Sequence, residues 1–100
     1  MYFKGDVVVV QFPFSDMLHA KKRPMVVLAV RGKDFLGCAI TSNLDSEGIP
    51  LTEFAEGSLP LESKIKYWQI NTVLNELVVR RIAKISKRTH QELVVKINEL

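Results

Sequence analysis

Residues 25–40 read MVVLAVRGKDFLGCAI, two apolar runs separated by a short polar segment that contains a glycine. Valine and isoleucine favour extended backbone, and a short glycine-containing segment between two such runs is typical of a hairpin. We therefore predict antiparallel strands at 25–30 and 35–40, joined by a turn at 31–34. The rest of the chain is expected to extend this hairpin into a mainly β structure.

Another strand is expected on the N-terminal side of the hairpin. Residues 7–12 read VVVVQF, a run typical of a buried strand. This strand follows Gly5 and stops at Pro13, because proline cannot donate a hydrogen bond to a sheet ladder. Residues 15–23 show no periodicity and are predicted to form a loop.

A long connection follows the hairpin. Residues 43–63 contain two glycines and two prolines, which indicates an irregular segment of unusual length for a passive loop. Residues 64–70 and 77–85 mix apolar and charged side chains in a strand-like pattern. They are predicted to be half-exposed strands, connected by residues 71–76.

The C-terminal segment has the periodicity of a helix. Ser86 or Thr89 is the expected N-cap, and Glu92 would complete a capping box with Thr89. The apolar residues at helical spacing are Leu93, Val94, Ile97 and Leu100. Five strands and one closing helix predict a small, strongly twisted β-barrel, with residues 1–100 forming a single domain.

The composition is that of a small domain with a basic surface. Hydrophobic residues make up 47% of the chain, and a domain of 100 residues exposes much of its surface, which favours a homodimer. A net charge of +3 favours an anionic partner. The single cysteine, Cys38, is expected to fill the core. No signal-like or membrane-spanning stretch is found, so we expect a cytoplasmic protein with no membrane partner.

A basic segment, KKRP at 21–24, leads into the predicted hairpin. Proline disfavours helical backbone at the preceding residue, so Arg23 is expected to be extended where the loop meets the strand. A guanidinium held there can form paired hydrogen bonds with a phosphate, for which lysine is a poor substitute. A solvated basic loop is the alternative interpretation.

The second strand of the hairpin ends in three small polar residues, Thr41, Ser42 and Asn43. Hydroxyl and amide groups at a strand end can hold a phosphate or a ribose, or they can cap a turn. Antiparallel pairing brings the start of one strand beside the end of the other. Arg23 is therefore expected to lie close to Thr41.

These segments, taken in order, resemble the MazF/PemK family of toxin ribonucleases. The matching elements are GDVV at 5–8, the Arg23-Pro24 pair and ITS at 40–42. The runs FPFSD at 12–16 and VVRRIAKIS at 78–86 are similar to a PemK-like branch of the family. The resemblance covers nearly the whole chain and implies an SH3-like barrel with a C-terminal helix.

The resemblance also implies an activity and its partners. It implies a homodimeric endoribonuclease toxin of a type II toxin-antitoxin system, which cleaves single-stranded RNA and is inhibited by the acidic tail of a cognate antitoxin. Arg23 and Thr41 are implied as the catalytic pair. Attack by the ribose 2′-hydroxyl would give a 2′,3′-cyclic phosphate and a 5′-hydroxyl, with no metal or other cofactor.

The inventory of reactive side chains agrees with such chemistry. His19, Cys38 and His90 are too widely separated in sequence for a zinc motif, although acidic residues can still bind magnesium through a substrate phosphate. The sequence does not identify the general base, because arginine releases its proton reluctantly. His19 is one candidate. The residues expected to contact the substrate are His19, Lys21, Lys22, Ser42 and Asn43. Other lysines, Lys64 and Lys66 among them, either follow the RNA backbone or are simply solvated.

Two other functions share this fold. A toxin of the CcdB type binds DNA gyrase through C-terminal residues that include a tryptophan, whereas residues 97–100 here read INEL. A non-catalytic RNA-binding or interaction module is the other alternative, because the loop before Arg23 lacks the Gly-Ser-Glu element that many MazF/PemK relatives carry. RNA cleavage distinguishes the ribonuclease from both.

Overall fold

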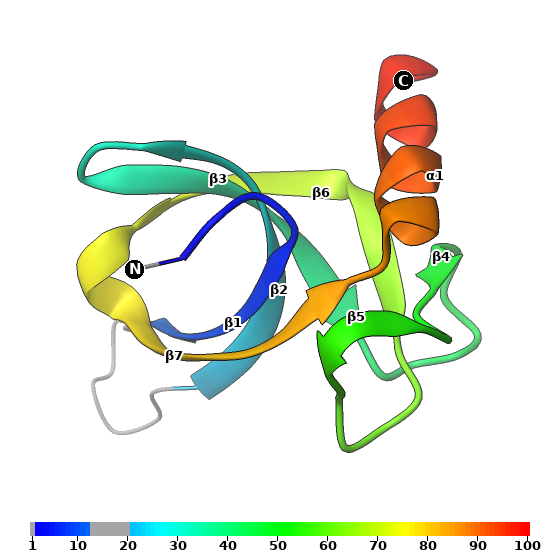
Figure 1. The fold of residues 1–100 in the computed structure, drawn as a ribbon, viewed down its shortest axis with the longest axis horizontal. Coiled ribbons are helices and arrows are strands. Elements are labelled where there is room, and N and C mark those ends of the chain that lie inside the picture. Colours follow the sequence, from blue (N-terminus) through cyan, green and yellow to red (C-terminus); the bar gives the residue numbers. More distant parts are fainter. Residues whose placement is uncertain (1, 13–20) are drawn as a thin grey trace.

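The computed structural model describes residues 2–12 and 21–100, which are mainly β with one C-terminal helix (Figure 1). The strands are β1 (Asp6–Phe12), β2 (Lys21–Arg31), β3 (Asp34–Thr41), β4 (Ile49–Pro50), β5 (Phe54–Gly57), β6 (Lys64–Leu74) and β7 (Val78–Ile85). A 3-10 helix (Asn75–Leu77) connects β6 to β7, and α1 spans Lys87–Asn98. None of the helices in these ranges is long and apolar enough to cross a membrane.

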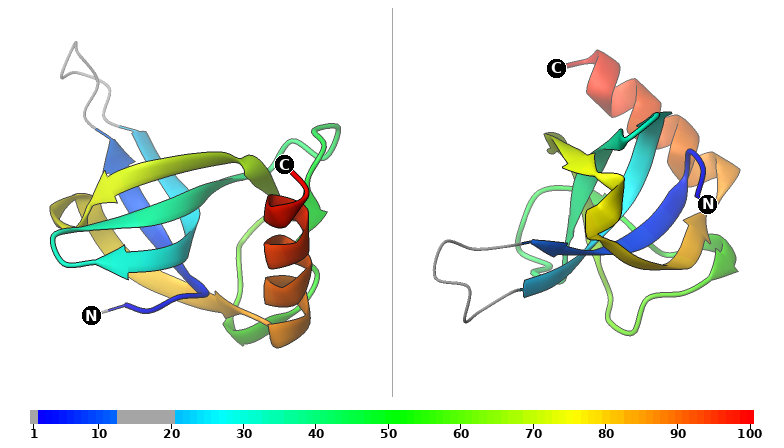
Figure 2. Two further views of the ribbon diagram at one scale, coloured as in Figure 1. Left: turned by 90° about the horizontal axis from the view of Figure 1, so that it is seen from above. Right: turned by 90° about the vertical axis from the view of Figure 1, so that its left-hand side faces the viewer.

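The strands form one curled antiparallel sheet with the order β4-β6-β3-β2-β1-β7-β5. The predicted hairpin, β2 with β3, lies near the centre of this order, and its two strands pair from Met25 opposite Ala39 to Arg31 opposite Asp34. Figure 2 shows α1 at one end of the curled sheet, where it packs against β6 and β4. The predicted fold class is confirmed, in the form of a curled half-barrel with a C-terminal helix.

The apolar core has two parts, which use opposite faces of the central strands. Val7 and Val26 belong to one buried cluster, while Val8, Val10 and Met25 belong to the other. Successive side chains of a strand point to opposite faces, so a strand covered on both faces is apolar at nearly every position. This explains why the central parts of β1 and β2, residues 7–10 and 25–30, are continuous apolar runs rather than alternating ones.

Several element boundaries differ from those predicted. Residues 21–23 belong to β2 rather than to a loop, because they pair with β1, where Arg23 lies opposite Val10. The connection at 43–63 contains β4 and β5, which pair with β6 and β7. Residues 71–74 continue β6 instead of connecting two strands. The described residues thus form seven strands rather than five, because pairing with distant strands overrides the local polarity of these segments.

Helix α1 is capped by Ser86, whose Oγ accepts a hydrogen bond from the Thr89 amide at 3.1 Å. The capping box starting at Thr89 was therefore a wrong prediction, since Thr89 lies within the helix. Leu93 is fully buried and Ile97 packs against the core. The other two members of the predicted apolar stripe, Val94 and Leu100, are exposed.

Cys38 lies in the core, as predicted, with no exposed surface. Burial raises the pKa of its thiol to about 12, because the thiolate would lose its hydration. The Sγ–H group donates to the carbonyl oxygen of Tyr67 at 3.8 Å. A thiol with so high a pKa and no access to solvent is a packing group rather than a nucleophile.

A buried carboxylate, Asp6, fixes the start of β1. Its Oδ2 accepts a hydrogen bond from the Phe3 amide at 2.7 Å, and its Oδ1 lies 3.0 Å from Arg81 Nε on β7. The Arg81 guanidinium also donates to Glu56 on β5 at 2.9 Å. Both contacts raise the pKa of the Arg81 guanidinium, and the hydrogen bond to Glu56 has the larger effect. The network connects three neighbouring strands at one edge of the sheet.

Asp6→Ala is expected to lower the free energy of unfolding by about 2 kcal/mol, because it removes a buried charged acceptor from a backbone amide and from a guanidinium. Urea unfolding followed by circular dichroism measures this change. Glu56→Gln removes only the solvent-exposed partner of Arg81, and it should have a much smaller effect. An equal loss of unfolding free energy in the two variants would contradict the importance of the buried Asp6 carboxylate.

Candidate active site

A pocket of about 140 Å³ lies where β1 ends, β2 begins and β3 ends. Arg23 and Thr41 both line it, so folding brings together the two residues that the sequence suggested as a pair. The bulged part of β6 forms the remaining wall. The full lining is Phe12, Arg23, Pro24, Met25, Ala39, Ile40, Thr41, Lys66, Gln69 and Asn71.

Arg23 is held by regular strand pairing, not by a loop. It lies opposite Val10, and Pro24 lies opposite Val9. The backbone is extended there, as expected for the residue before a proline. The side chain of Arg23 is exposed, and it forms no ion pair with residues 2–12 or 21–100. Its guanidinium is therefore free to bind an anion.

Thr41 is the last residue of β3, and it pairs with Lys64 on β6. Its Oγ1 accepts a hydrogen bond from the Asn43 amide at 3.1 Å. A hydroxyl group that accepts one hydrogen bond can still donate its own proton. The turn after β3 thus orients Thr41 so that its O–H group is available to an oxygen atom in the pocket.

A large irregularity in β6 supplies three polar side chains to the pocket. Cys38 pairs with Ile70, but the next residue of β3, Ala39, pairs with Lys66. Residues 67–69 are therefore extra on β6, and bulges of this kind redirect side chains, often beside active sites. Gln69, within this irregularity, lines the pocket together with Lys66 and Asn71, which lie on either side of it.

The two amides in this wall were not predicted from the sequence. Asn71 was expected in a connection between strands, and Lys66 was expected only as one of several basic residues. The available signal was the spacing of Gln69 and Asn71, which lie two residues apart in a β-prone segment and so point to the same face. The bulge that turns them into the pocket has no local signature.

The other predicted contacts lie around the pocket or outside the described residues. Lys21 and Lys22 are exposed and pair with Phe12 and Gln11, so they flank the pocket without lining it. His19 belongs to the segment 13–20, which lies outside the described residues. Ser42 and Asn43 are exposed in the turn after β3 and do not line the pocket. The side chain of Asn43 accepts a hydrogen bond from the Asp45 amide at 3.1 Å and caps this turn.

The charge of the pocket favours an anion. Arg23 and Lys66 are its two cations, and no carboxylate lines it among the described residues. Hydroxyl and amide groups add neutral hydrogen-bond donors, which a phosphate can accept from. In the same part of the chain, no three side chains among histidine, cysteine, aspartate and glutamate lie close enough together to hold a metal ion.

Comparison with known proteins agrees with this fold. The chain is similar to MazF in the MazE–MazF complex from Deinococcus radiodurans, with 14% identity, a TM-score of 0.80, and coverage of 98% of this chain and 93% of the other. It is also similar to the Mycobacterium tuberculosis toxin MazF-mt6, with 16% identity, a TM-score of 0.71 and coverage of 94% and 93%. A mycobacterial endoribonuclease solved with its cognate antitoxin gives 12% identity, a TM-score of 0.72 and coverage of 99% and 93%.

Sequence comparison identifies the family directly. No curated protein is matched by sequence, and the structural neighbours are too distant in sequence to show more than a shared fold. A family model, however, matches residues 3–100. The chain therefore belongs to the family of PemK-like, MazF-like toxins of type II toxin-antitoxin systems.

Proposed function

We propose that this chain is an endoribonuclease toxin that cleaves single-stranded RNA in the pocket lined by Arg23 and Thr41. The observation that supports this most directly is the meeting of a guanidinium, which has no ion-pair partner among the described residues, and an oriented hydroxyl group in a pocket with no described carboxylate. Membership of the toxin family and the fold shared with endoribonucleases agree with it. Because the substrate is RNA, the expected site of action is the cytoplasm.

In the proposed reaction, the ribose 2′-oxygen attacks the adjacent phosphorus. The 2′-hydroxyl gives its proton to a base, its oxygen forms a bond to phosphorus, the bond from phosphorus to the 5′-oxygen breaks, and the leaving 5′-oxygen takes up a proton from an acid or from water. The products are a 2′,3′-cyclic phosphate and a 5′-hydroxyl. Arg23 and Lys66 stabilise the negative charge that develops on the phosphoryl oxygens, and the Thr41 hydroxyl orients the phosphate. His19 remains a hypothesis for the general base.

Analysis of the product ends tests this proposal. Purified protein is incubated with a long unstructured RNA in EDTA, and the 5′ ends of the fragments are tested for phosphorylation by a polynucleotide kinase. We expect fragments with free 5′-hydroxyl ends, and no cleavage of an RNA that carries a 2′-deoxyribose at the cleaved position. RNA that is bound but stays intact would instead favour a non-catalytic RNA-binding module.

A second copy of the chain is the proposed partner of the surface shared by β6 and α1. Trp68 and Ile70 on β6 and Val94 and Val95 on α1 are between 37% and 55% exposed. Apolar side chains grouped on adjacent elements mark an interaction surface. The proposed homodimer would bury them.

Trp68→Glu is therefore expected to convert the dimer into a monomer, because it places a charge in the apolar contact. Size-exclusion chromatography with light scattering measures the mass directly. Val79→Glu changes an equally exposed apolar residue on β7 and serves as the matched control. A Trp68→Glu protein with the mass of the parent would contradict this interface.

The proposed inhibitor is a cognate antitoxin. Two similar structures are complexes of this kind, one of MazE with MazF and one of an endoribonuclease with its antitoxin. An acidic segment would be attracted to the same cations that bind the RNA phosphate. Addition of the cognate antitoxin should stop RNA cleavage.

A further inference from the structure

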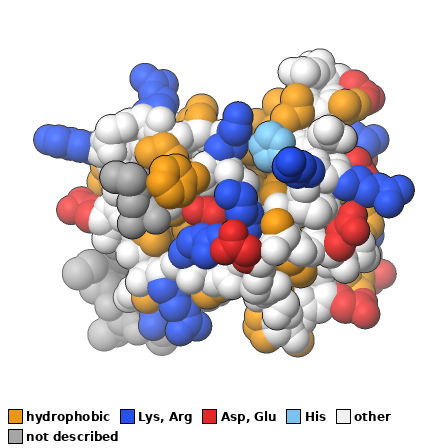
Figure 3. Space-filling view, viewed as in Figure 1, with side chains coloured by type: hydrophobic (Ala, Val, Ile, Leu, Met, Phe, Trp, Pro, Cys, Tyr) orange, Lys and Arg blue, Asp and Glu red, His pale blue; other side chains and the backbone are white. Residues whose placement is uncertain are grey.

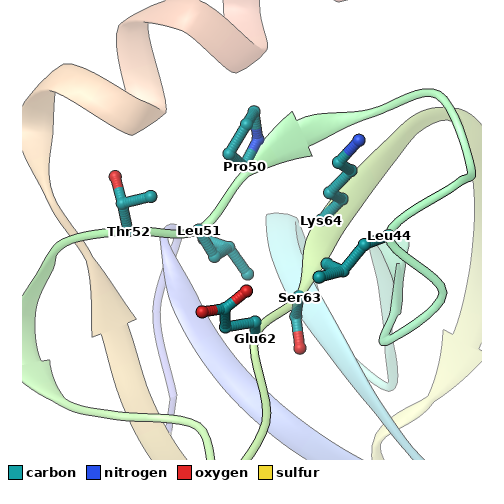
Figure 4. A pocket seen from close by; sticks show the side chains of 7 residues that line it. All are labelled: Leu44, Pro50, Leu51, Thr52, Glu62, Ser63 and Lys64. Carbon is teal, nitrogen blue, oxygen red and sulfur yellow. The ribbon is translucent and has the colours of Figure 1, made fainter.

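Figure 4 shows a second hollow, which has a volume of about 550 Å³. Its lining is Leu44, Pro50, Leu51, Thr52, Glu62, Ser63 and Lys64. Thr41 in the first pocket and Lys64 in the second are direct partners on β3 and β6. Paired strands lie about 5 Å apart, so an RNA strand that binds its scissile phosphate at Thr41 has a neighbouring base within reach of this hollow.

The walls of the hollow suit a flat aromatic ring. Leu44, Pro50 and Leu51 form an apolar side, and Leu44 has 46% of its surface exposed at the rim. Nucleobases have apolar faces and polar edges, and apolar side chains pack against the faces when a single strand is bound. The volume lies within the range of small-molecule pockets.

The polar groups of the hollow include one carboxylate, that of Glu62, together with two hydroxyl groups and the Lys64 ammonium. The Ser63 hydroxyl donates to the Leu61 carbonyl at 2.9 Å, and Lys64 Nζ donates to the Ser46 carbonyl at 3.1 Å. Glu62 is exposed, and it makes no hydrogen bond or ion pair with the described residues. An ionised carboxylate only accepts hydrogen bonds, so it requires N–H groups on its ligand.

We propose that this hollow is a base-specificity subsite and that Glu62 selects a base with an amino group on its Watson–Crick edge. Guanine is the best match, because its N1–H and N2–H groups are adjacent and meet the two oxygens of one carboxylate. Uracil is rejected, because its two carbonyl oxygens flank a single N–H and face the carboxylate with like charge. The inference rests on the proposed RNA cleavage and adds a sequence preference to it.

Cleavage of an RNA library with a randomised segment tests the subsite. The 5′ ends of the products are sequenced for the parent protein, for Glu62→Gln and for Glu92→Gln, which removes the same charge from an exposed position on α1. The parent and Glu92→Gln should favour an amino-bearing base, guanine first, at one position beside the cleaved bond. Glu62→Gln should weaken this preference roughly tenfold while still cutting the pooled RNA.

The outcomes separate this inference from the proposed function. If the parent protein cleaves no RNA at all, the endoribonuclease proposal itself fails. If RNA is cleaved and the base profile of Glu62→Gln equals that of the parent, or if uracil is the favoured base, the subsite is overturned and the endoribonuclease stands. Leu44→Ala, a change at an exposed rim residue that does not threaten folding, should weaken the same preference without moving it to another position.

Discussion

Arg23→Ala is expected to reduce the rate of RNA cleavage by about 10²- to 10³-fold, the usual loss when one preorganised donor to a developing oxyanion is removed. The loss should fall mainly on kcat, because the guanidinium is matched to charge that grows in the transition state. Arg23→Lys should recover only part of the rate, since a lysine keeps the charge but cannot form the paired hydrogen bonds. Single-turnover cleavage of a short RNA measures these differences.

The other end of β2 offers a matched control for Arg23. Arg31 is also exposed, but it does not line the pocket. Arg31→Ala should cleave at close to the parent rate, and both alanine variants should unfold at nearly the same urea concentration as the parent. A folded Arg23→Ala protein with the full rate would remove Arg23 from the mechanism.

Thr41→Val is expected to slow cleavage by roughly 10- to 100-fold, because valine keeps the shape of threonine but has no hydroxyl group to donate. The same change leaves the Asn43 amide without its acceptor, so Thr41→Ser is the informative companion. Serine retains both hydrogen bonds and should keep most of the rate. Thr72→Val, on an exposed part of β6 outside the pocket, controls for loss of a hydroxyl.

A result in which Thr41→Val cleaves as fast as Thr41→Ser would contradict the orienting role of the hydroxyl. The thermal midpoints of the two variants distinguish an effect on chemistry from an effect on the turn after β3. If the slow variant is also strongly destabilised, its rate is compared with that of Asn43→Ala. This control removes the side chain that caps the turn but keeps Thr41.

The parts of the molecule that were predictable from sequence are those with local causes. The β2–β3 hairpin follows from two apolar runs and a turn, and hairpin pairing alone places Arg23 near Thr41. The position of Cys38 in the core follows in the same way from an apolar run. In each case the sequence signal lies within one hairpin.

The missed parts depend on contacts between segments distant in sequence. Strands β4 and β5 are short and contain little β-prone sequence, and they exist because β6 and β7 offer them edges to pair with. Three extra residues lie in β6 because Ala39 pairs with Lys66, whereas regular pairing would place it opposite Gln69. No propensity within residues 64–74 specifies that shift.

The two hollows lie in different parts of the sheet, and their residues therefore differ in how well they tolerate mutation. Arg23 and Thr41 lie on β2 and β3, strands at the middle of the sheet that are covered on both faces. The second hollow is formed largely by residues 44–52 and 62–63, around the two-residue edge strand β4. The exposed residues of this hollow, such as Leu44, Thr52 and Glu62, can be replaced at little cost in stability, whereas residues of the covered central strands cannot. If the two hollows have the proposed roles, the preferred RNA sequence can change by substitution at the second hollow while the residues proposed for cleavage stay the same.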